Sequence, residues 1–199
     1  SPLATQAAVT VLQNGGNAMD AALAAGAVQA VVEPQSTSIG GDCFCLYAKA
    51  GGDKIVALNG SGRAPLELSA EWLLEQGITE IEQQSPHSVT VPTAIDAWTQ
   101  LNRDYGTKPL SDLLQPAIGY ARDGFPISHR VAEDFASCHD LLAGDADIAG
   151  VYLKDGEDYK HGDRCTNPNL AKTLEAVATH GRDGFYKGWV ADDLLGKLQ

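Results

Sequence analysis

The segment from Ala18 to Val32 constrains the fold more than any other part of the sequence, because it is small and apolar around nearly its whole circumference. A helix with that pattern is buried on all sides, and its alanines and glycine let neighbouring backbones approach closely. Asn17 supplies an N-cap, and Asp20 stands where a carboxylate can reach back to the free N–H groups of the first turn. Pro34 ends the helix. The sequence therefore predicts a central helix with other elements packed around it.

A helix precedes this segment and a β-hairpin follows it. The first helix begins at Pro2, where the missing N–H costs nothing, and ends at residues 14–16, Asn-Gly-Gly. Residues 43–48 alternate as a strand does, and residues 55–58 form a second short run after a Gly-Gly-Asp turn signal. We expect these two runs to pair as an antiparallel hairpin packed under the first helices.

The remainder of the chain is mainly helical. Further helices are predicted for residues 71–76, 92–105, 116–122, 128–142 and 167–179 and after residue 188, with a polar surface excursion over residues 143–166. Helices that follow a hairpin in this way indicate an α+β fold, with helices layered on an antiparallel sheet. We expect residues 1–199 to form one partial domain, because no stop signal closes the last helix.

Composition and charge exclude several classes of protein. The 199 residues carry a formal net charge of −12, and such a surface repels nucleic acid and anionic membranes. No stretch approaches the roughly 20 apolar residues of a membrane helix, and no signal peptide is visible. We therefore expect a cytoplasmic protein that binds neither nucleic acid nor membrane, with a periplasmic or secreted location as the alternative.

Nothing in the sequence predicts a metal or a cofactor. The four cysteines and five histidines show no zinc-ligand spacing, and no phosphate-binding loop is present. We interpret the cysteines as buried free thiols in a reducing compartment.

A set of short motifs, in order along nearly the whole chain, resembles the large subunit of the γ-glutamyltransferase (γ-glutamyltranspeptidase) superfamily. The motifs are Pro2-Leu3-Ala4-Thr5, Gly15-Gly16-Asn17-Ala18-Met19-Asp20-Ala21-Ala22, Val32-Glu33-Pro34-Gln35-Ser36, Ile39-Gly40-Gly41, Val91-Pro92, Tyr105-Gly106, Pro116-Ala117-Ile118, Gly124-Phe125-Pro126 and Gly184-Phe185-Tyr186-Lys187-Gly188. One such motif is weak evidence, but the ordered set is specific.

The resemblance implies an αββα Ntn-hydrolase sandwich made by a self-cleaving precursor. It also implies a partner, a small subunit that begins with the nucleophilic Thr, in a heterodimer or a dimer of heterodimers. In that chemistry the Thr hydroxyl attacks an amide carbonyl with its own α-amine as the base, and the acyl group passes to water or to an amine. The present residues then carry no catalytic residue, and we expect them to be inactive alone.

One segment departs from the family pattern. γ-Glutamyltransferases typically carry Asp-x-Arg-Glu-x-Ala-Pro, whose Arg grips the substrate α-carboxylate as a planar fork. Here residues 59–65 are Asn-Gly-Ser-Gly-Arg-Ala-Pro, so that Ser61 stands at the place of that Arg and Arg63 lies two residues later. The candidate substrate-binding residues are therefore Arg63, Ser61 and Asn59.

Each candidate also has a structural interpretation. Arg63 either anchors a substrate carboxylate or braces the loop, and Asn59 is also an ordinary turn former. Asp42, after a Gly-Gly pair, either pairs with an Arg, tunes the nucleophile's amine or is simply solvated.

The function implied by the resemblance is amide hydrolysis or acyl transfer on γ-glutamyl compounds such as glutathione. The departure at Ser61 favours an alternative within the family, an acylase or amidohydrolase acting on another small amide. A non-catalytic scaffold subunit is the alternative from another class.

Overall fold

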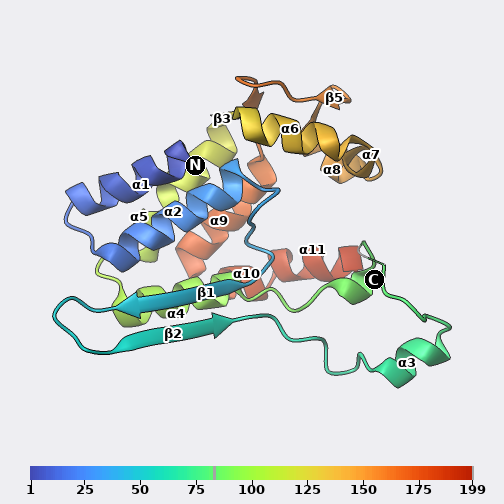
Figure 1. Cartoon of the computed structure of the whole chain (residues 1–199), viewed down its shortest axis with the longest axis horizontal. Helices are drawn as coiled ribbons and strands as arrows, with labels where there is room; N and C mark the ends of the chain where they lie inside the picture. Colours follow the sequence, from blue (N-terminus) through green and yellow to red (C-terminus); the bar gives the residue numbers. More distant parts are fainter. Residues whose placement is uncertain (83, 199) are drawn as a thin grey trace.

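The computed structural model describes residues 1–82 and 84–198, and helices in layers lie over a two-stranded hairpin (Figure 1). The helices are α1 (Pro2–Gln13), α2 (Ala18–Val32), α3 (Ala70–Glu75), the 3₁₀ turn η1 (Pro86–Ser88), α4 (Ala94–Tyr105), α5 (Leu110–Asp123), α6 (His129–Ser137), α7 (His139–Ala143), α8 (Ala146–Tyr152), α9 (Pro168–His180), α10 (Asp183–Tyr186) and α11 (Trp189–Leu198). The strands are β1 (Cys43–Ala48), β2 (Ile55–Gly60), β3 (Phe125–Pro126), β4 (Leu153–Lys154), β5 (Glu157–Asp158) and β6 (Arg164–Cys165). The predicted α+β class is confirmed.

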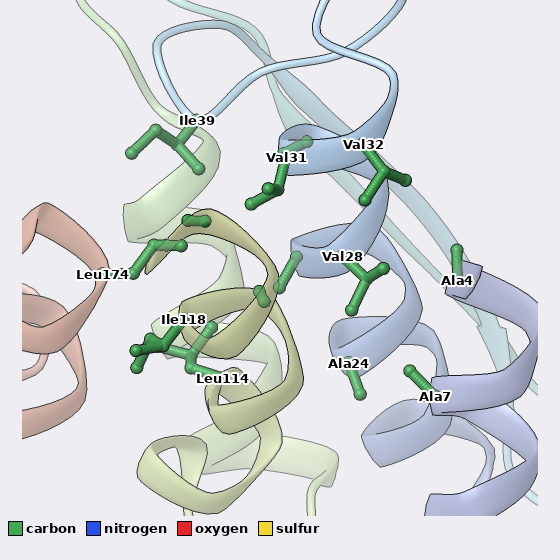
Figure 2. Packing of buried hydrophobic residues seen from close by; sticks show 14 of the residues in the cluster. Ala4, Ala7, Ala24, Val28, Val31, Val32, Ile39, Leu114, Ile118 and Leu174 are labelled. Carbon is green, nitrogen blue, oxygen red and sulfur yellow. The ribbon is translucent and has the colours of Figure 1, made fainter. Parts of the chain in front are cut away.

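Helix α2 lies at the centre of the helical layer, as its all-round apolar pattern predicts. It packs against α1 on one side and α5 on the other, and α9 covers the far side of α5 (Figure 2). Ala24 and Val28 are fully buried between these helices, with Leu114 of α5 and Leu174 of α9 in the same cluster. The predicted capping box is also present, since Asn17 Oδ1 accepts from Asp20 N and Asp20 Oδ2 accepts from Asn17 N, both at 2.9 Å. The small side chains of α2 thus allow α1 and α5 to pack closely against it.

The hairpin β1–β2 forms as predicted, but its main neighbour is α4 and not the first two helices. The strands pair antiparallel with Cys43 opposite Gly60 and Ala48 opposite Ile55. The face with Cys43 and Tyr47 turns toward the helices, where the Tyr47 ring lies 4.9 Å from that of Tyr105 in α4. α4 reaches this position because it also packs on α2.

The opposite face of the hairpin is apolar and open. The exposed fractions of Phe44, Leu46 and Ile55 are 67%, 79% and 72%. A contiguous apolar sheet face of this kind usually marks a surface that another element covers.

Two predicted helix starts are wrong. α4 begins at Ala94, not Pro92, because the N–H groups of Thr93 and Ala94 both bond to Gly41 O. α5 begins at Leu110 and contains Pro116, which was expected to open the helix. Its buried face continues on both sides of the proline, so the apolar burial outweighs the one hydrogen bond that proline removes.

The region from residue 128 to residue 166 also differs from the prediction. The helix capped by Ser128 is interrupted at Cys138, which separates α6 from α7. The expected polar excursion contains α8, the hairpin β4–β5 and strand β6, and it contributes Leu153 and Cys165 to the interior. The pairing of β6 with β3 explains the burial of Cys165, because it draws Cys165 opposite the buried Phe125. Such pairing between distant segments leaves no local sequence signal.

The cysteines are free, but only one of them is buried. Cys165 is buried, Cys43 and Cys45 are half-buried, and Cys138 is exposed, so the expectation of buried thiols is correct for Cys165 alone. Cys138 is exposed because it lies at the break between α6 and α7. Within the part of the chain that the structure describes, no helix is both long and apolar enough to cross a membrane.

Candidate functional site

The loops that carry the predicted site residues meet where the hairpin ends and α4 begins. Gly41 O accepts hydrogen bonds from Thr93 N at 3.0 Å and from Ala94 N at 2.9 Å. Thr93 Oγ1 donates to Gly60 O, and Val91 N donates to Arg63 O at 3.0 Å. Three segments distant in sequence, around residues 41, 61 and 92, are therefore joined by main-chain bonds into one surface.

The segment from Asn59 to Arg63, which runs from the end of β2 into the following loop, is held by the side chains of Asn59 and Asp42. Asn59 Oδ1 accepts from Ser61 N at 3.0 Å, so the Asn59 side chain forms a turn within the loop. Asp42 Oδ1 accepts from Gly62 N at 2.8 Å, and Asp42 Oδ2 lies 3.5 Å from Ser61 Oγ. The structure therefore brings Asn59 and Ser61 together with Asp42.

Residue 62 has to be glycine for the loop to take this course. A Cβ at Gly62 would lie 2.4 Å from Val91 O and 2.6 Å from Thr90 Oγ1. Both distances are far below van der Waals contact, so any side chain would push the loop away from residues 90 and 91.

Arg63 is exposed and joins these contacts through its main chain. Its main-chain oxygen accepts from Val91 N, but among the described residues its guanidinium makes no hydrogen bond and no ion pair. The exposed guanidinium is thus available to a ligand or to a part of the protein beyond the described residues, whereas bracing of the loop falls to the Arg63 main chain.

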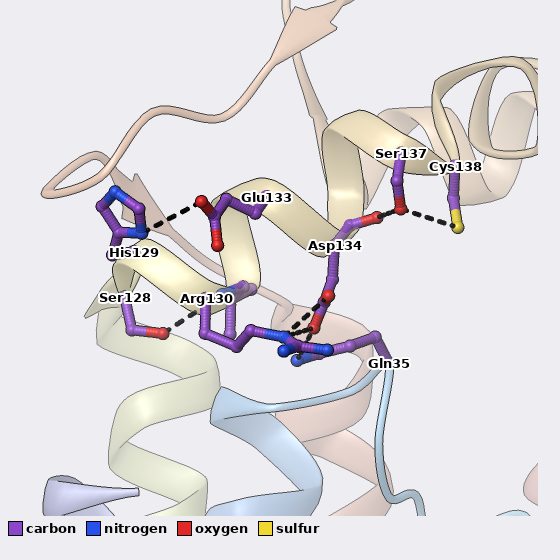
Figure 3. A network of polar contacts seen from close by, with 9 residues as sticks. Gln35, Ser128, His129, Arg130, Glu133, Asp134, Ser137 and Cys138 are labelled. Atoms are coloured by element: carbon purple, nitrogen blue, oxygen red, sulfur yellow. Dashed lines mark hydrogen bonds and ion pairs between the residues drawn. The ribbon is translucent and has the colours of Figure 1, made fainter.

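The loop between α2 and β1 is hydrogen-bonded to helix α6 through Gln35 and Asp134. Gln35 Nε2 donates to Asp134 Oδ2 at 3.1 Å, and Arg130 Nε lies 2.8 Å and 2.9 Å from the two oxygens of Asp134 (Figure 3). The bonds from Arg130, with that from Gln35, lower the pKa of the Asp134 carboxyl, so it stays ionised at neutral pH. Ile39 anchors the same loop in the apolar core (Figure 2).

A polar cavity of about 360 Å³ opens inside this loop. It is lined by Pro34, Gln35, Ser36, Thr37, Ser38, Gly41 and Asp42. The hydroxyl and amide side chains of the lining are neutral and can donate or accept hydrogen bonds. Among the described residues of this lining, the Asp42 carboxylate is the one charged side chain. The cavity thus meets the Asn59–Arg63 loop at Asp42.

The described residues of the site include no activated nucleophile. Burial, with a contribution from neighbouring Cys45, raises the pKa of the Cys43 thiol, and burial also raises the pKa of the Cys45 thiol. Both thiols are protonated at neutral pH and are poor nucleophiles. Within the described residues, no group of His, Cys, Asp and Glu side chains could hold a metal ion.

Apart from Asp42, sequence reasoning did not single out the residues that hold the site together. Thr93 and Asp96 at the start of α4 bind Gly60 O and the Arg182 side chain respectively. Tyr186 Oη donates to Pro92 O at 2.7 Å, and the Arg182 guanidinium lies 4.5 Å from the Tyr186 ring centroid. Thr93 precedes α4 without capping it by a side-chain bond, and its partner Gly60 lies too far along the chain to be inferred from the local sequence.

Helices layered on an antiparallel hairpin, with the polar loops gathered at its end, define a mixed α+β domain. The γ-glutamyltranspeptidase family model matches residues 4–199, and the chain belongs to that family. The resemblance drawn from the sequence motifs is thereby confirmed.

Individual relatives support the assignment. The chain is 35% identical to the glutathione hydrolase-like YwrD proenzyme of Bacillus subtilis, over 99% of this chain and 37% of the relative. It is 34% identical to the glutathione hydrolase proenzyme of Escherichia coli, over 98% of this chain and 34% of the relative. It is also 35% identical to the oxamate amidohydrolase proenzyme of Klebsiella pneumoniae, over 96% of this chain and 37% of the relative. The chain thus spans about a third of the length of these curated relatives.

Solved structures match as well. The γ-glutamyltranspeptidase of Helicobacter pylori superposes with a TM-score of 0.93 and 34% identity, over 99% of this chain and 57% of that one. The cephalosporin acylase of Bacillus halodurans gives a TM-score of 0.90 and 35% identity, over 96% of this chain and 37% of that one. The fold is therefore shared by solved proteins whose names refer to different activities, a γ-glutamyltranspeptidase and a cephalosporin acylase.

Proposed function

We propose that the chain is the front part of the large subunit of an enzyme that cleaves amides through an acyl-enzyme. The main support for this proposal is the family match over residues 4–199. The hydrogen bonds that join the site loops at the start of α4 are consistent with it. In the proposed reaction an N-terminal Thr of a small subunit attacks the amide carbonyl and its α-amine takes the proton. The amine product leaves, and water or a second amine accepts the acyl group.

The proposed partner is that small subunit, with the rest of the large subunit. Phe44, Leu46 and Ile55 present an apolar face that the helices do not cover, and an isolated two-stranded hairpin is only marginally stable in water. A second sheet packed on this face would complete an αββα sandwich. We therefore propose a heterodimer, or a dimer of heterodimers, in which these residues shape the substrate site and supply structural support.

Two substrate classes compete for the proposed enzyme. γ-Glutamyl compounds such as glutathione are the substrates suggested by most names in the family. A non-glutamyl acylase or small-amide amidohydrolase is favoured by a specific observation, since Ser61 lies beside the Asp42 carboxylate where a gripping cation would be needed. Arg63 is the remaining cation of the loop, and we propose that it meets the carboxylate of any carboxylate-bearing substrate.

The deciding experiment compares substrates on the complete, self-processed protein. The kcat/KM for a γ-glutamyl anilide is measured beside those for anilides with neutral acyl groups. We expect a neutral amide to be the better substrate, and γ-glutamyl turnover equal to that of the best neutral amide contradicts this choice.

A gene that encodes no processing-site Thr after residue 199 would instead support a non-catalytic scaffold. The cytoplasmic location stays a prediction that cell fractionation tests.

A further inference from the structure

We propose that Asp42 selects the charge of the substrate group that enters the cavity between α2 and β1, admitting a neutral or cationic group and disfavouring a carboxylate. In this role Asp42 is also a positioning residue, because it holds the Ser61–Gly62 segment in place. The inference rests on the proposed amide-cleaving function and adds to it a class of substrate.

Asp42 has a fixed direction. The carbonyl of the preceding residue, Gly41, accepts from both Thr93 N and Ala94 N, and the strand β1 begins directly after it at Cys43. With its main chain held on both sides, the Asp42 side chain reaches Gly62 N at 2.8 Å and lies 3.5 Å from Ser61 Oγ. The Asp42 carboxylate is therefore held in a fixed orientation between the cavity and the Asn59–Arg63 segment.

The charge of Asp42 is not neutralised by its surroundings. Among residues 1–82 and 84–198, no Lys, Arg or His forms an ion pair with it. The other polar lining groups of the cavity, on Gln35, Ser36, Thr37 and Ser38, are neutral. An ammonium or amide placed there can bond to Asp42, while a carboxylate meets an uncompensated like charge.

The two roles of Asp42 can be separated by two substitutions in the complete, self-processed protein. Asp42→Asn keeps an oxygen that can accept from Gly62 N but removes the charge. Asp42→Ala removes both. The matched control is Asp53→Asn, the same chemical change on the exposed turn at the other end of the hairpin.

Three anilides of equal chain length provide the kinetic test: glutaryl, 5-amino-5-oxopentanoyl and 5-aminopentanoyl p-nitroanilide. We expect wild type to favour the amine and the amide over the carboxylate. Asp42→Asn is expected to shift the amine-to-carboxylate ratio of kcat/KM toward the carboxylate by about fivefold, mainly through KM, as suits one charge at an exposed position. Asp53→Asn should leave the ratio unchanged. A ratio that Asp42→Asn does not move overturns the charge selection.

The loop-holding role has its own measurement. We expect both substitutions to change KM, and Asp42→Ala to lower kcat for all three anilides by more than Asp42→Asn does, because asparagine can still accept from Gly62 N. Equal kcat values for wild type and Asp42→Ala overturn the positioning role.

A binding measurement keeps the inference apart from the proposed function. Calorimetry compares pentylammonium with pentanoate, which differ in the charged end and carry no amide for the enzyme to cleave. Wild type should bind the cation more tightly, and Asp42→Asn should narrow the difference. Equal binding of the two probes, or binding of neither, overturns the inference even if the enzyme cleaves amides. Preferential binding of the cation without cleavage of any anilide supports the charge selection and removes the proposed function.

Discussion

Asp20 and Thr107, 87 residues apart in the chain, are joined by two hydrogen bonds inside the protein. Asp20 Oδ1 accepts from Thr107 N at 2.9 Å, and Asp20 Oδ2 accepts from Thr107 Oγ1 at 2.5 Å. Lys108 N adds a bond at 3.2 Å, and the Asp20 side chain is fully buried. A carboxylate that caps α2 thus also fixes the turn between α4 and α5.

Replacement of this carboxylate should destabilise the protein strongly. Asp20→Ala leaves the part-buried amides of Asn17, Thr107 and Lys108 without their acceptor on the fully buried Asp20, and we expect the free energy of unfolding to fall by about 3 kcal/mol. Urea denaturation of the full-length protein measures the loss. Asp53→Ala on the exposed hairpin turn is the control, and a loss equal to the control would contradict the prediction.

The same carboxylate makes stability depend on pH. Burial acts to raise the Asp20 pKa, but the bonds from the Thr107 hydroxyl and from the amides of Asn17, Thr107 and Lys108 outweigh it, so the pKa is lowered. A lowered folded-state pKa stabilises the protein above the unfolded-state value, about 3.9, and this contribution disappears as the pH falls further through the folded-state pKa. We expect the Tm difference between wild type and Asp20→Asn to be constant from pH 7 to pH 5 and to shrink below about pH 4. A difference that grows toward acid pH would show that the sign is wrong.

Gly62→Ala tests the close approach of the site loop to residues 90 and 91. Its Cβ would lie 2.4 Å from Val91 O, so we expect the loop to shift, with a loss of about 1–3 kcal/mol in stability and reduced kcat/KM. The control is Gly119→Ala inside α5, where a Cβ meets no atom within 4 Å and should add about 0.5–1 kcal/mol of stability. Amide turnover and urea denaturation of the two variants would be compared. A Gly62→Ala enzyme with wild-type kinetics would separate the loop from the reaction.

Arg63→Ala tests the free guanidinium. Because the side chain makes no hydrogen bond within the described residues, we expect Tm to change little and KM for a carboxylate-bearing amide to rise by about tenfold. Lys54→Ala on the hairpin turn controls for the loss of one positive charge. An unchanged KM with a lowered Tm would identify Arg63 as a structural brace in the complete protein.

Leu46→Asp tests the open face of the hairpin. Leu46 is 79% exposed and lies beside Phe44 and Ile55 on that face, so a charge there should block the packing of a second sheet at little cost to the helical layer. We expect less processed heterodimer on size exclusion and on denaturing gels. Leu12→Asp, on the outer part of α1 at 50% exposure, serves as the comparison. Normal processing and assembly of Leu46→Asp would remove the proposed interface.

Features that depend on neighbouring residues could be predicted well. The burial of α2 follows from its composition, its capping box follows from Asn17 and Asp20, and the helix after Asn167 has its cap bond at Leu170 N. The hairpin follows from alternation around a glycine turn. Each of these patterns is contained within one turn or one strand, where spacing alone fixes which groups can meet.

Features that depend on distant partners could not be predicted. Pro116 was expected to start a helix, but it lies inside α5. The helix tolerates it because α5 is buried against α2 and α9, which the local sequence does not reveal. The burial of Cys165 needs the pairing of β6 with β3, and the exposure of Phe44 and Leu46 cannot be told from alternation, which defines two faces without saying which is covered.

The candidate site divides in the same way. The order of residues along the chain was enough to identify the family, the departure from its pattern at Ser61, and the candidates Asn59, Ser61 and Arg63. The folded chain alone shows that Asp42 holds Gly62 N, and that the Arg63 guanidinium makes no hydrogen bond or ion pair among the described residues. The physical reason is that motifs and caps are read along the chain, whereas a carboxylate's partner is chosen by packing that brings residues 20 positions apart into hydrogen-bond distance.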